Sequence, residues 1–158
     1  MRIGFGTDIH RLEQGRELRL GGIAIDAPFG SLGHSDGDAL LHAITDAILG
    51  AVAAGDIGTH FPPSDERWKD ANSKFFLTEA VSVAKNAGFR IGNIDSVVHL
   101  EKPKLRPHID SMRESIASIC GIETTAVSVK AKTAEGLGDI GSSMAVSADA
   151  IVLLVAVE

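Results

Sequence analysis

The spacing of apolar residues along the chain predicts three helices. Over residues 36–54, apolar side chains recur at helical spacing, and we expect Ser35 or Asp36 to cap the start of this helix. A second helix is expected between residues 73 and 88, where an Asn-Ser pair precedes the apolar positions and a glycine follows them. A third is expected over residues 107–121, with proline in its first turn and glycine at its end.

Six other stretches have the composition and alternation of strands, and two of them form a predicted hairpin with a Gly-Gly turn. They are Arg2–His10, Leu18–Leu20, Ile23–Ile25, Ile94–Glu101, Val127–Lys132 and Ala145–Val157. The last stretch is apolar on both faces, so we expect it in the centre of a sheet or at a subunit contact. Strands interspersed with helices and a hairpin predict an α+β fold in which helices cover a sheet. The segment Gly55–Asn72 lacks periodicity, and loops of this length tend to be functional or mobile.

Composition narrows the class of protein. A length of 158 residues favours one domain over 1–158. Fifteen Lys and Arg against 21 Asp and Glu give a net charge of −6, which argues against broad binding to nucleic acid or to an anionic membrane. Charged residues precede any apolar signal region, the longest apolar run is far below the ~20 residues of a membrane span, and the single cysteine cannot form an internal disulfide. We therefore expect a cytoplasmic protein.

Three residues have the types and spacing of a metal site. Asp8 and His10 are two apart on a predicted strand, so both side chains leave the same face, and His42 lies on the first predicted helix. A set of Asp, His and His is typical of a catalytic zinc site with one open position. Asp38 or Asp46, four residues on either side of His42, could orient its ring. The alternative is a surface Asp-x-His pair and a half-buried helical histidine.

Two further groups of residues suit an anionic ligand. His34 and Ser35, at the entry to the first helix, could bind a phosphate, or they could be an ordinary helix start with an exposed histidine. Five basic residues gather in two short segments that could be neighbours: Lys102, Lys104, Arg106, Lys130 and Lys132. They could bind a phosphorylated small molecule, or they could protect a sheet edge. Glu135 could hold a divalent cation against phosphates or could be a turn residue. Cys120 and Trp68 are interpreted as packing residues.

Taken together, these motifs resemble the 2-C-methyl-D-erythritol 2,4-cyclodiphosphate synthase family. The resemblance is collinear from Arg2 to Val157. The motifs that carry it are Asp8-Ile9-His10, Gly33-His34-Ser35-Asp36-Gly37-Asp38 with His42, Gly55-Asp56-Ile57-Gly58, Phe61-Pro62-Pro63-Ser64-Asp65, Lys102-Pro103-Lys104, Pro107-His108 and Lys130-Ala131-Lys132-Thr133-Ala134-Glu135. The run from His34 to Asp38, followed by Gly-Asp-Ile-Gly, is the most specific of them.

The resemblance implies a role for each matching position. Asp8, His10 and His42 match the zinc ligands, and Ile9 lies between two of them. His34 and Ser35 match contacts to phosphate and methylerythritol, and Asp56, Ile57 and Gly58 match the loop around the erythritol hydroxyls. Phe61, Pro62, Pro63, Ser64 and Asp65 match a loop that lines the substrate. Leu100, Glu101, Lys102, Pro103, Lys104, Leu105 and Arg106 match the cytidine pocket, and Lys132, Thr133, Ala134 and Glu135 match the diphosphate site. Among these, His34, Thr133 and Glu135 are implied to be catalytic.

The resemblance also implies a reaction, an assembly and cofactors. The family converts 4-diphosphocytidyl-2-C-methyl-D-erythritol 2-phosphate to the cyclic diphosphate and CMP. The resemblance further implies a ferredoxin-like subunit and a homotrimer with active sites between neighbouring subunits. The cofactors it implies are one Zn²⁺ per subunit and a second divalent cation, Mg²⁺ or Mn²⁺, on Glu135.

The chain departs from the family pattern at two places, and two other functions stay open. The stretch Asp139–Met144 has no arginine where many members carry one, and Pro63 stands where many carry Asp. A zinc-dependent phosphohydrolase and a non-catalytic trimeric binder of nucleotide or isoprenoid diphosphate are the competing classes.

Overall fold

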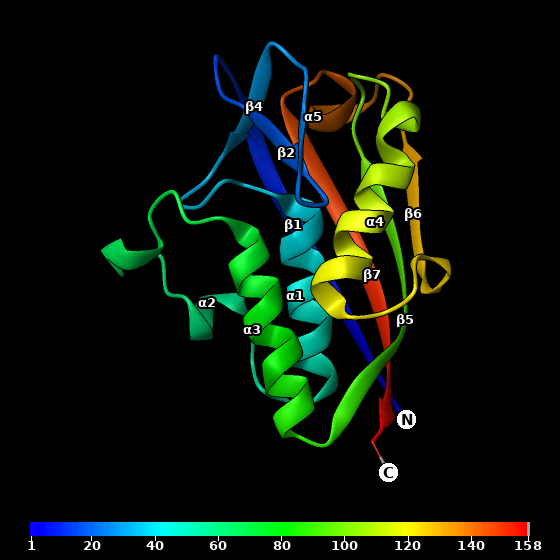
Figure 1. Cartoon of the computed structure of the whole chain (residues 1–158). Helices are drawn as coiled ribbons and strands as arrows, with labels where there is room; N and C mark the ends of the chain where they lie inside the picture. Colours follow the sequence, from blue (N-terminus) through cyan, green and yellow to red (C-terminus); the bar gives the residue numbers. More distant parts are fainter. Residues whose placement is uncertain (158) are drawn as a thin grey trace.

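The computed structural model describes residues 1–157 and is built around a five-stranded mixed sheet (Figure 1). The strand order is β4-β1-β7-β5-β6, with β5 and β6 parallel and the other neighbours antiparallel. The strands are β1 (Arg2–Gln14), β4 (Phe29–Leu32), β5 (Phe89–His99), β6 (Val127–Lys132) and β7 (Ala145–Ala156). A separate hairpin joins β2 (Leu18–Leu20) to β3 (Ile23–Ile25). Glu158, the last residue of the predicted 1–158 domain, lies outside the described residues.

Three longer helices cover one face of this sheet (Figure 1). They are α1 (Ala39–Ala51), α3 (Ser73–Asn86) and α4 (Ile109–Cys120). The short elements are α2 (Ile57–His60), α5 (Gly138–Gly141) and the 3₁₀ turns η1 (Glu66–Trp68), η2 (Arg106–His108) and η3 (Thr124–Ala126). Within residues 1–157, no helix has the length and apolar character needed to cross a membrane.

The predicted elements are present, with changed bounds. β7 lies between β1 and β5, which confirms its central place in the sheet. β5 begins five residues before the predicted Ile94 and ends at His99, so Glu101 lies beyond the strand. Pro107 belongs to the 3₁₀ turn before α4 rather than to α4 itself. The predicted loop Gly55–Asn72 contains two short helical turns, α2 and η1, in an arm that projects from the body (Figure 1).

The predicted start of the first helix is wrong by three residues. α1 begins at Ala39, and its cap is Asp38 rather than Ser35 or Asp36. The Asp38 carboxylate accepts hydrogen bonds from the backbone N–H groups of Leu41, Gly21 and Gly22 at 3.0, 2.9 and 2.6 Å. A buried carboxylate with three N–H donors is well satisfied, so this residue ties the β2–β3 turn to the helix start.

The layers agree with the expected α+β fold, but the helices and strands do not follow one another along the chain in the ferredoxin-like order. A ferredoxin-like chain runs β-α-β-β-α-β. Here the main elements run β1, α1 with α3, β5, α4, β6, β7. The difference arises because α4 connects β5 to β6 as a parallel pair, and parallel neighbours need such a crossover.

Glycines in β1 allow α1 to lie directly against the sheet. A Cβ atom on Gly4 would lie 1.7 Å from the backbone oxygen of Ala47, and one on Gly6 would lie 2.1 Å from the backbone oxygen of Ala43. No residue with a side chain fits at these positions without moving the helix. Because side chains alternate along a strand, Asp8 and His10 leave the same face as the two glycines and point toward α1.

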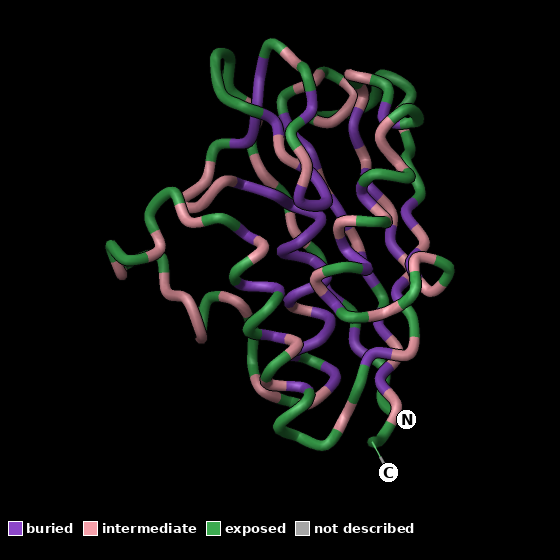
Figure 2. The backbone as a smooth tube through the Cα atoms, in the orientation of Figure 1, coloured by how far each residue is buried: buried purple, intermediate pink, exposed green. Residues whose placement is uncertain are grey.

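The opposite face of the sheet carries no helix in the described chain (Figure 1) and exposes several apolar side chains. Figure 2 shows buried positions alternating with half-buried or exposed ones along β5 and β7. Ile3, Phe5 and Ile9 of β1 are 73, 61 and 62 % exposed, and Ile151 of β7 is 49 % exposed. Phe5 and Ile151 are direct cross-strand partners. Contiguous exposed apolar patches on a folded domain mark interaction surfaces.

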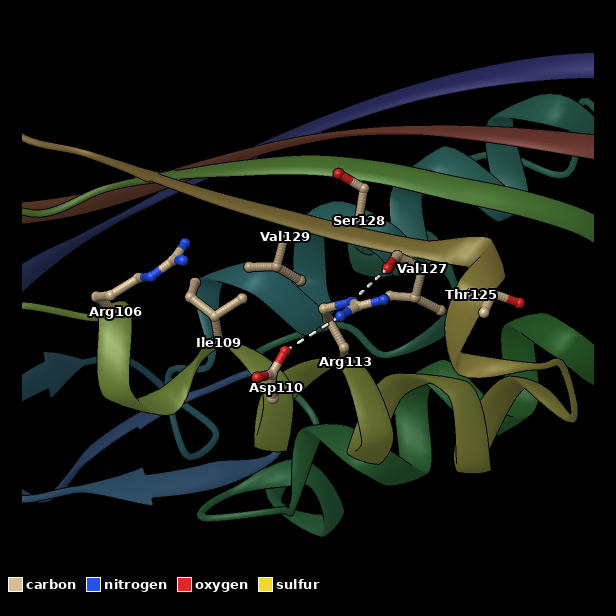
Figure 3. A pocket seen from close by; sticks show the side chains of 8 residues that line it. All are labelled: Arg106, Ile109, Asp110, Arg113, Thr125, Val127, Ser128 and Val129. Atoms are coloured by element: carbon tan, nitrogen blue, oxygen red, sulfur yellow. Dashed lines mark hydrogen bonds and ion pairs between the residues drawn. The ribbon is translucent and has the colours of Figure 1, made fainter.

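The outer edge of β6 is partly covered by Arg113 of α4 (Figure 3). Its Nε donates to the backbone oxygen of Val127 at 2.8 Å, and its other guanidinium nitrogens reach Thr124 and Asp110 at 3.1 Å. These bonds lie beside an open cavity of about 450 Å³ between α4 and β6. The arginine therefore occupies part of an edge that could otherwise pair with another strand.

Candidate metal centre and substrate cavities

Donor atoms of Asp8, His10 and His42 converge on one point. Oδ2 of Asp8 lies 2.8 Å from Nε2 of His10 and 2.9 Å from Nδ1 of His42, and the two ring nitrogens are 3.2 Å apart. Among the residues described by the structure, these three form the one group of His, Cys, Asp or Glu side chains with metal-ligand geometry. The predicted convergence of two positions on β1 with one on α1 is confirmed.

The remaining ring nitrogen of each histidine has a protein partner. Nδ1 of His10 lies 3.1 Å from the backbone oxygen of Leu32, and Nε2 of His42 lies 2.8 Å from Oγ of Ser73. When Nδ1 of His10 and Nε2 of His42 carry the protons, Nε2 of His10 and Nδ1 of His42 present lone pairs to the point they share with Asp8. Two lone pairs and a carboxylate oxygen facing each other are a donor set for Zn²⁺. The residues therefore fit the metal.

The electrostatics of the cluster favour an ionised carboxylate. Burial opposes the charge on Asp8, but hydrogen bonds from His10 and His42 outweigh it and hold its pKa well below the usual range. Burial likewise disfavours the charged form of His10, yet the hydrogen bond and charge of Asp8 raise its pKa overall. The cluster has a carboxylate ready to bind a cation.

The predicted role of Asp38 or Asp46 in orienting His42 is wrong. Asp38 is occupied by three backbone donors, as described above, and Asp46 accepts from the backbone N–H of Ile57 at 2.7 Å. Helical spacing brought both carboxylates near His42. Backbone N–H groups of neighbouring turns bind them instead. The side chain at 2.8 Å from Nε2 of His42 is that of Ser73.

The metal cluster opens into a cavity of about 290 Å³. Most of its other lining residues were predicted from the resemblance: His34, Ser35, Ile57, Gly58, Phe61 and Pro63. Ile9 does not line it, because its side chain lies on the opposite face of β1 from Asp8 and His10. The cavity therefore has the potential metal ligands at one end and a largely apolar lining elsewhere.

The other predicted members of the arm lie beside this cavity. Asp56 caps α2 by accepting from both the backbone N–H and the hydroxyl of Thr59 at 2.7 Å, and these bonds lower its pKa. Asp65 caps η1 and pairs with Arg67 at 2.6 Å. The backbone oxygen of Asp65 is 3.4 Å from Nε2 of His34, so the arm touches the helix-entry loop. Pro62 and Ser64 belong to the same arm but do not line the cavity.

A second cavity, of about 280 Å³, lies where β5 and β6 end. The parallel pairing sets His99 opposite Lys132, which brings the two predicted basic segments together. Its lining residues are Leu100, Pro103, Lys104, Leu105, Arg106, Ala131, Lys132 and Thr133. Lys130 instead pairs with Asp95 at 2.7 Å. Lys102 is exposed and does not line this cavity.

The Thr133–Glu135 turn lies at the rim of the second cavity. The Thr133 hydroxyl donates to Oε1 of Glu135 at 2.7 Å, and Glu135 adopts a positive φ of 52°. Glu101 accepts from the backbone N–H of Ala134 at 3.0 Å and so fixes the turn to the end of β5. Glu135 is exposed and belongs to no group of three or more potential metal ligands among the described residues.

Sequence reasoning missed two kinds of site residue. Trp68 and Phe76 line the metal cavity as well as packing in an aromatic cluster, with Phe61 5.3 Å from Trp68 and 4.6 Å from Phe76 between ring centroids. Ser73 was assigned only to a helix start. The sequence held one indication of another role for Ser73. Asn72 caps α3, so the serine that follows it is not needed as the cap. Cys120 is a packing residue, as predicted, since it is buried in the core.

Known proteins resemble this chain over nearly its whole length. The profile of the YgbB family matches residues 1–155. A 2-C-methyl-D-erythritol 2,4-cyclodiphosphate synthase from Syntrophomonas wolfei is 53 % identical over 98 % of both chains. A solved structure of 2C-methyl-D-erythritol-2,4-cyclodiphosphate synthase superposes with a TM-score of 0.91 at 43 % identity, covering 98 % of this chain and all of the other. A CDP-bound form superposes equally well, at 42 % identity and the same coverage. The chain therefore belongs to the YgbB family, the family of the 2-C-methyl-D-erythritol 2,4-cyclodiphosphate synthases.

Proposed function

We propose that this chain converts 4-diphosphocytidyl-2-C-methyl-D-erythritol 2-phosphate to 2-C-methyl-D-erythritol 2,4-cyclodiphosphate and CMP. The observation that carries the proposal is the convergence of Asp8, His10 and His42 at a ligand-sized cavity, in a chain 53 % identical to a synthase of that name. The enzyme is thus a lyase of isoprenoid biosynthesis. The roles of individual residues are argued below.

The reaction needs no protein base to generate the nucleophile. A phosphate monoester has a second pKa near ~6 and is largely dianionic at neutral pH. Once Asp8, His10 and His42 are assigned to the metal, His34 is the one titratable side chain left among the described residues that line the cavity. We assign His34 to hydrogen bonding with a phosphate oxygen, with Ser35 beside it.

The obstacle is to bring one anion against another in a flexible molecule. Asp8, His10 and His42 would hold Zn²⁺, which when bound would supply a Lewis acid to offset phosphate charge. The chain supplies orientation: Ile57, Gly58 and Phe61 form the wall against which the methylerythritol would lie. Holding both reacting groups in one geometry can lower a barrier by on the order of 7–11 kcal/mol in the best-oriented cases.

The second cavity suits the cytidine and diphosphate end of the substrate. Lys104 and Lys132 bring positive charge to a pocket that otherwise has apolar and backbone lining. The solved structure described as a CDP-bound form supports a nucleotide ligand for this fold. We propose that Thr133 binds the diphosphate and that Glu135 holds a second cation, Mg²⁺ or Mn²⁺. Because Glu135 belongs to no group of three or more potential metal ligands among the described residues, most other ligands of that ion must come from the phosphates and water.

We propose that the active site forms between subunits of a homotrimer. The two cavities share no lining residue within one chain, and β7 and β5 separate the strand of the metal site from β6. The apolar face formed by Ile3, Phe5 and Ile151 gives the subunits a surface to bury. We also propose a cytoplasmic location, with a small nucleotide as the ligand rather than nucleic acid or membrane.

Two other classes predict different products. A zinc phosphohydrolase would use water as nucleophile, and a binding protein would release no CMP. The test is CMP release from the substrate and from its analogue without the 2-phosphate, both at saturating concentration in labelled water. We expect release from the substrate alone and no label in the product. Comparable rates for both compounds would show hydrolysis, and no turnover of either would show a binder.

A further inference from the structure

A hydrogen-bonded chain leads from the metal cluster to a carboxylate that has no place in the proposed reaction. Nε2 of His42 lies 2.8 Å from Oγ of Ser73, and Oγ of Ser73 contacts Oδ1 of Asp36. The other oxygen of Asp36 accepts from the backbone N–H of Ser73 at 3.0 Å. Asp36 therefore holds Ser73 at two points, and Ser73 is completely buried.

The direction of each hydrogen bond in this chain can be worked out. An ionised carboxylate only accepts, so the hydroxyl proton of Ser73 must point to Asp36. Oγ of Ser73 then faces the His42 ring with a lone pair, and Nε2 of His42 must carry the proton. With Nε2 protonated, Nδ1 is the nitrogen that can bind a cation at the point shared with Asp8 and His10. Without a cation, Nδ1 faces Oδ2 of Asp8 at hydrogen-bond distance, 2.9 Å.

The surroundings keep the chain in this geometry. The backbone N–H of Asp36 donates to the oxygen of Ala71 at 3.1 Å, and the N–H of Asp70 donates to the oxygen of His34 at 2.8 Å. These bonds fasten the loop before α1 to the residues before α3. Ser35 also approaches Nε2 of His42, at 3.2 Å, but its longer contact does not reverse the order set by the carboxylate.

We propose that Asp36 and Ser73 are positioning residues that fix the tautomer and orientation of His42 for metal binding. The inference rests on the proposed function, in which His42 is a zinc ligand. Partners behind a ligating histidine typically change metal affinity roughly 10- to 100-fold when removed. We expect a loss of that size in Ser73→Ala. In Asp36→Asn we expect a smaller loss, because an amide can still contact the serine but no longer imposes the direction of its proton.

The test measures zinc affinity by competition with a chromophoric chelator, and the Nε2 proton of His42 by ¹H–¹⁵N correlation spectra of the zinc-loaded protein. Ser82→Ala is the matched control, since Ser82 lies on the same helix and its hydroxyl bonds only to the backbone oxygen of Thr78, at 3.1 Å. The wild-type spectrum should show an Nε2 proton on His42 that exchanges slowly with solvent, because it is bound to the buried Ser73 hydroxyl. Ser73→Ala should show faster exchange of that proton and weaker zinc binding, while Ser82→Ala matches the wild type.

Three results separate the possible failures. If the wild type binds no zinc, the metal assignment of the proposed function is wrong. If the wild type binds zinc but Ser73→Ala and Asp36→Asn bind it as tightly as Ser82→Ala, the positioning role is wrong. A zinc-loaded wild type in which the Nε2 proton of His42 exchanges rapidly with solvent would also overturn it, and that measurement requires no variant to fold.

Discussion

Adding one methyl group at Gly6 should separate the metal ligands without touching any of them. The new Cβ of Gly6→Ala would lie 2.1 Å from the backbone oxygen of Ala43, next to His42 in α1. Real Cβ contacts essentially never fall under 3.0 Å, so helix and strand must part by about 0.9 Å. Metal sites tolerate deviations of about 0.2 Å in ligand distances. The displacement is several times larger, so zinc affinity should fall steeply.

The same displacement has a cost in stability that can be measured separately. Overpacking a core typically costs about 1–3 kcal/mol. For a chain of this length that corresponds to a fall in Tm of roughly 2–12 °C. Thermal unfolding of the metal-free variant gives the stability change, and chelator competition at a temperature where it is folded gives the zinc affinity.

The control is Gly50→Ala, on the solvent side of the same helix. Its Cβ would meet nothing within 4 Å, and alanine is favoured over glycine in a helix by about 0.5–1 kcal/mol. This variant should therefore keep its zinc affinity and unfold at the same or a higher temperature. A Gly6→Ala protein with wild-type Tm and wild-type zinc affinity would refute the close strand–helix packing and its role in the site.

Three other predictions use different measurements. His42→Ala should lose tightly bound zinc while keeping the wild-type circular dichroism spectrum; full zinc content by elemental analysis would count against the ligand set. Mixing His42→Ala with Lys104→Ala chains should restore part of the activity, because a mixed trimer contains an interface with both residues intact; a monomeric mass at micromolar concentration would contradict the shared site. The Cys120 thiol should resist alkylation at pH 8 until the protein unfolds, because burial raises its pKa to about 12 and hides the sulfur; rapid labelling of the folded protein would show that the helix end opens.

The residues with strong local signals were predictable from the sequence. The period of two along β1 placed Asp8 and His10 on one face, and the helical period placed His42 on the first predicted helix. The Gly-Gly turn predicted the hairpin of β2 and β3. These predictions depend only on residues close in the sequence, so they do not depend on how the helices and strands pack together.

The partners of the site residues were harder to predict, because they depend on which backbone groups are left unpaired. Asp38 lies four residues before His42, yet it binds the N–H groups of Gly21 and Gly22, which come together only when the β2–β3 turn packs against α1. The ferredoxin-like subunit implied by the resemblance differs from the structure for a similar reason, since no local pattern states whether β6 pairs parallel or antiparallel to β5. Ser73 contacts His42 only after α3 has packed beside α1.

Phosphorus NMR of the product in ¹⁸O-labelled water tests the proposed cyclisation most directly. The diphosphocytidyl 2-phosphate substrate is incubated with zinc-loaded enzyme and Mg²⁺, and the spectrum is followed to completion. Attack by the substrate's own 2-phosphate predicts CMP and two mutually coupled resonances of a cyclic diphosphate, with no isotope shift from solvent oxygen. An open-chain product with phosphate signals shifted by ¹⁸O would contradict it and show that water is the nucleophile.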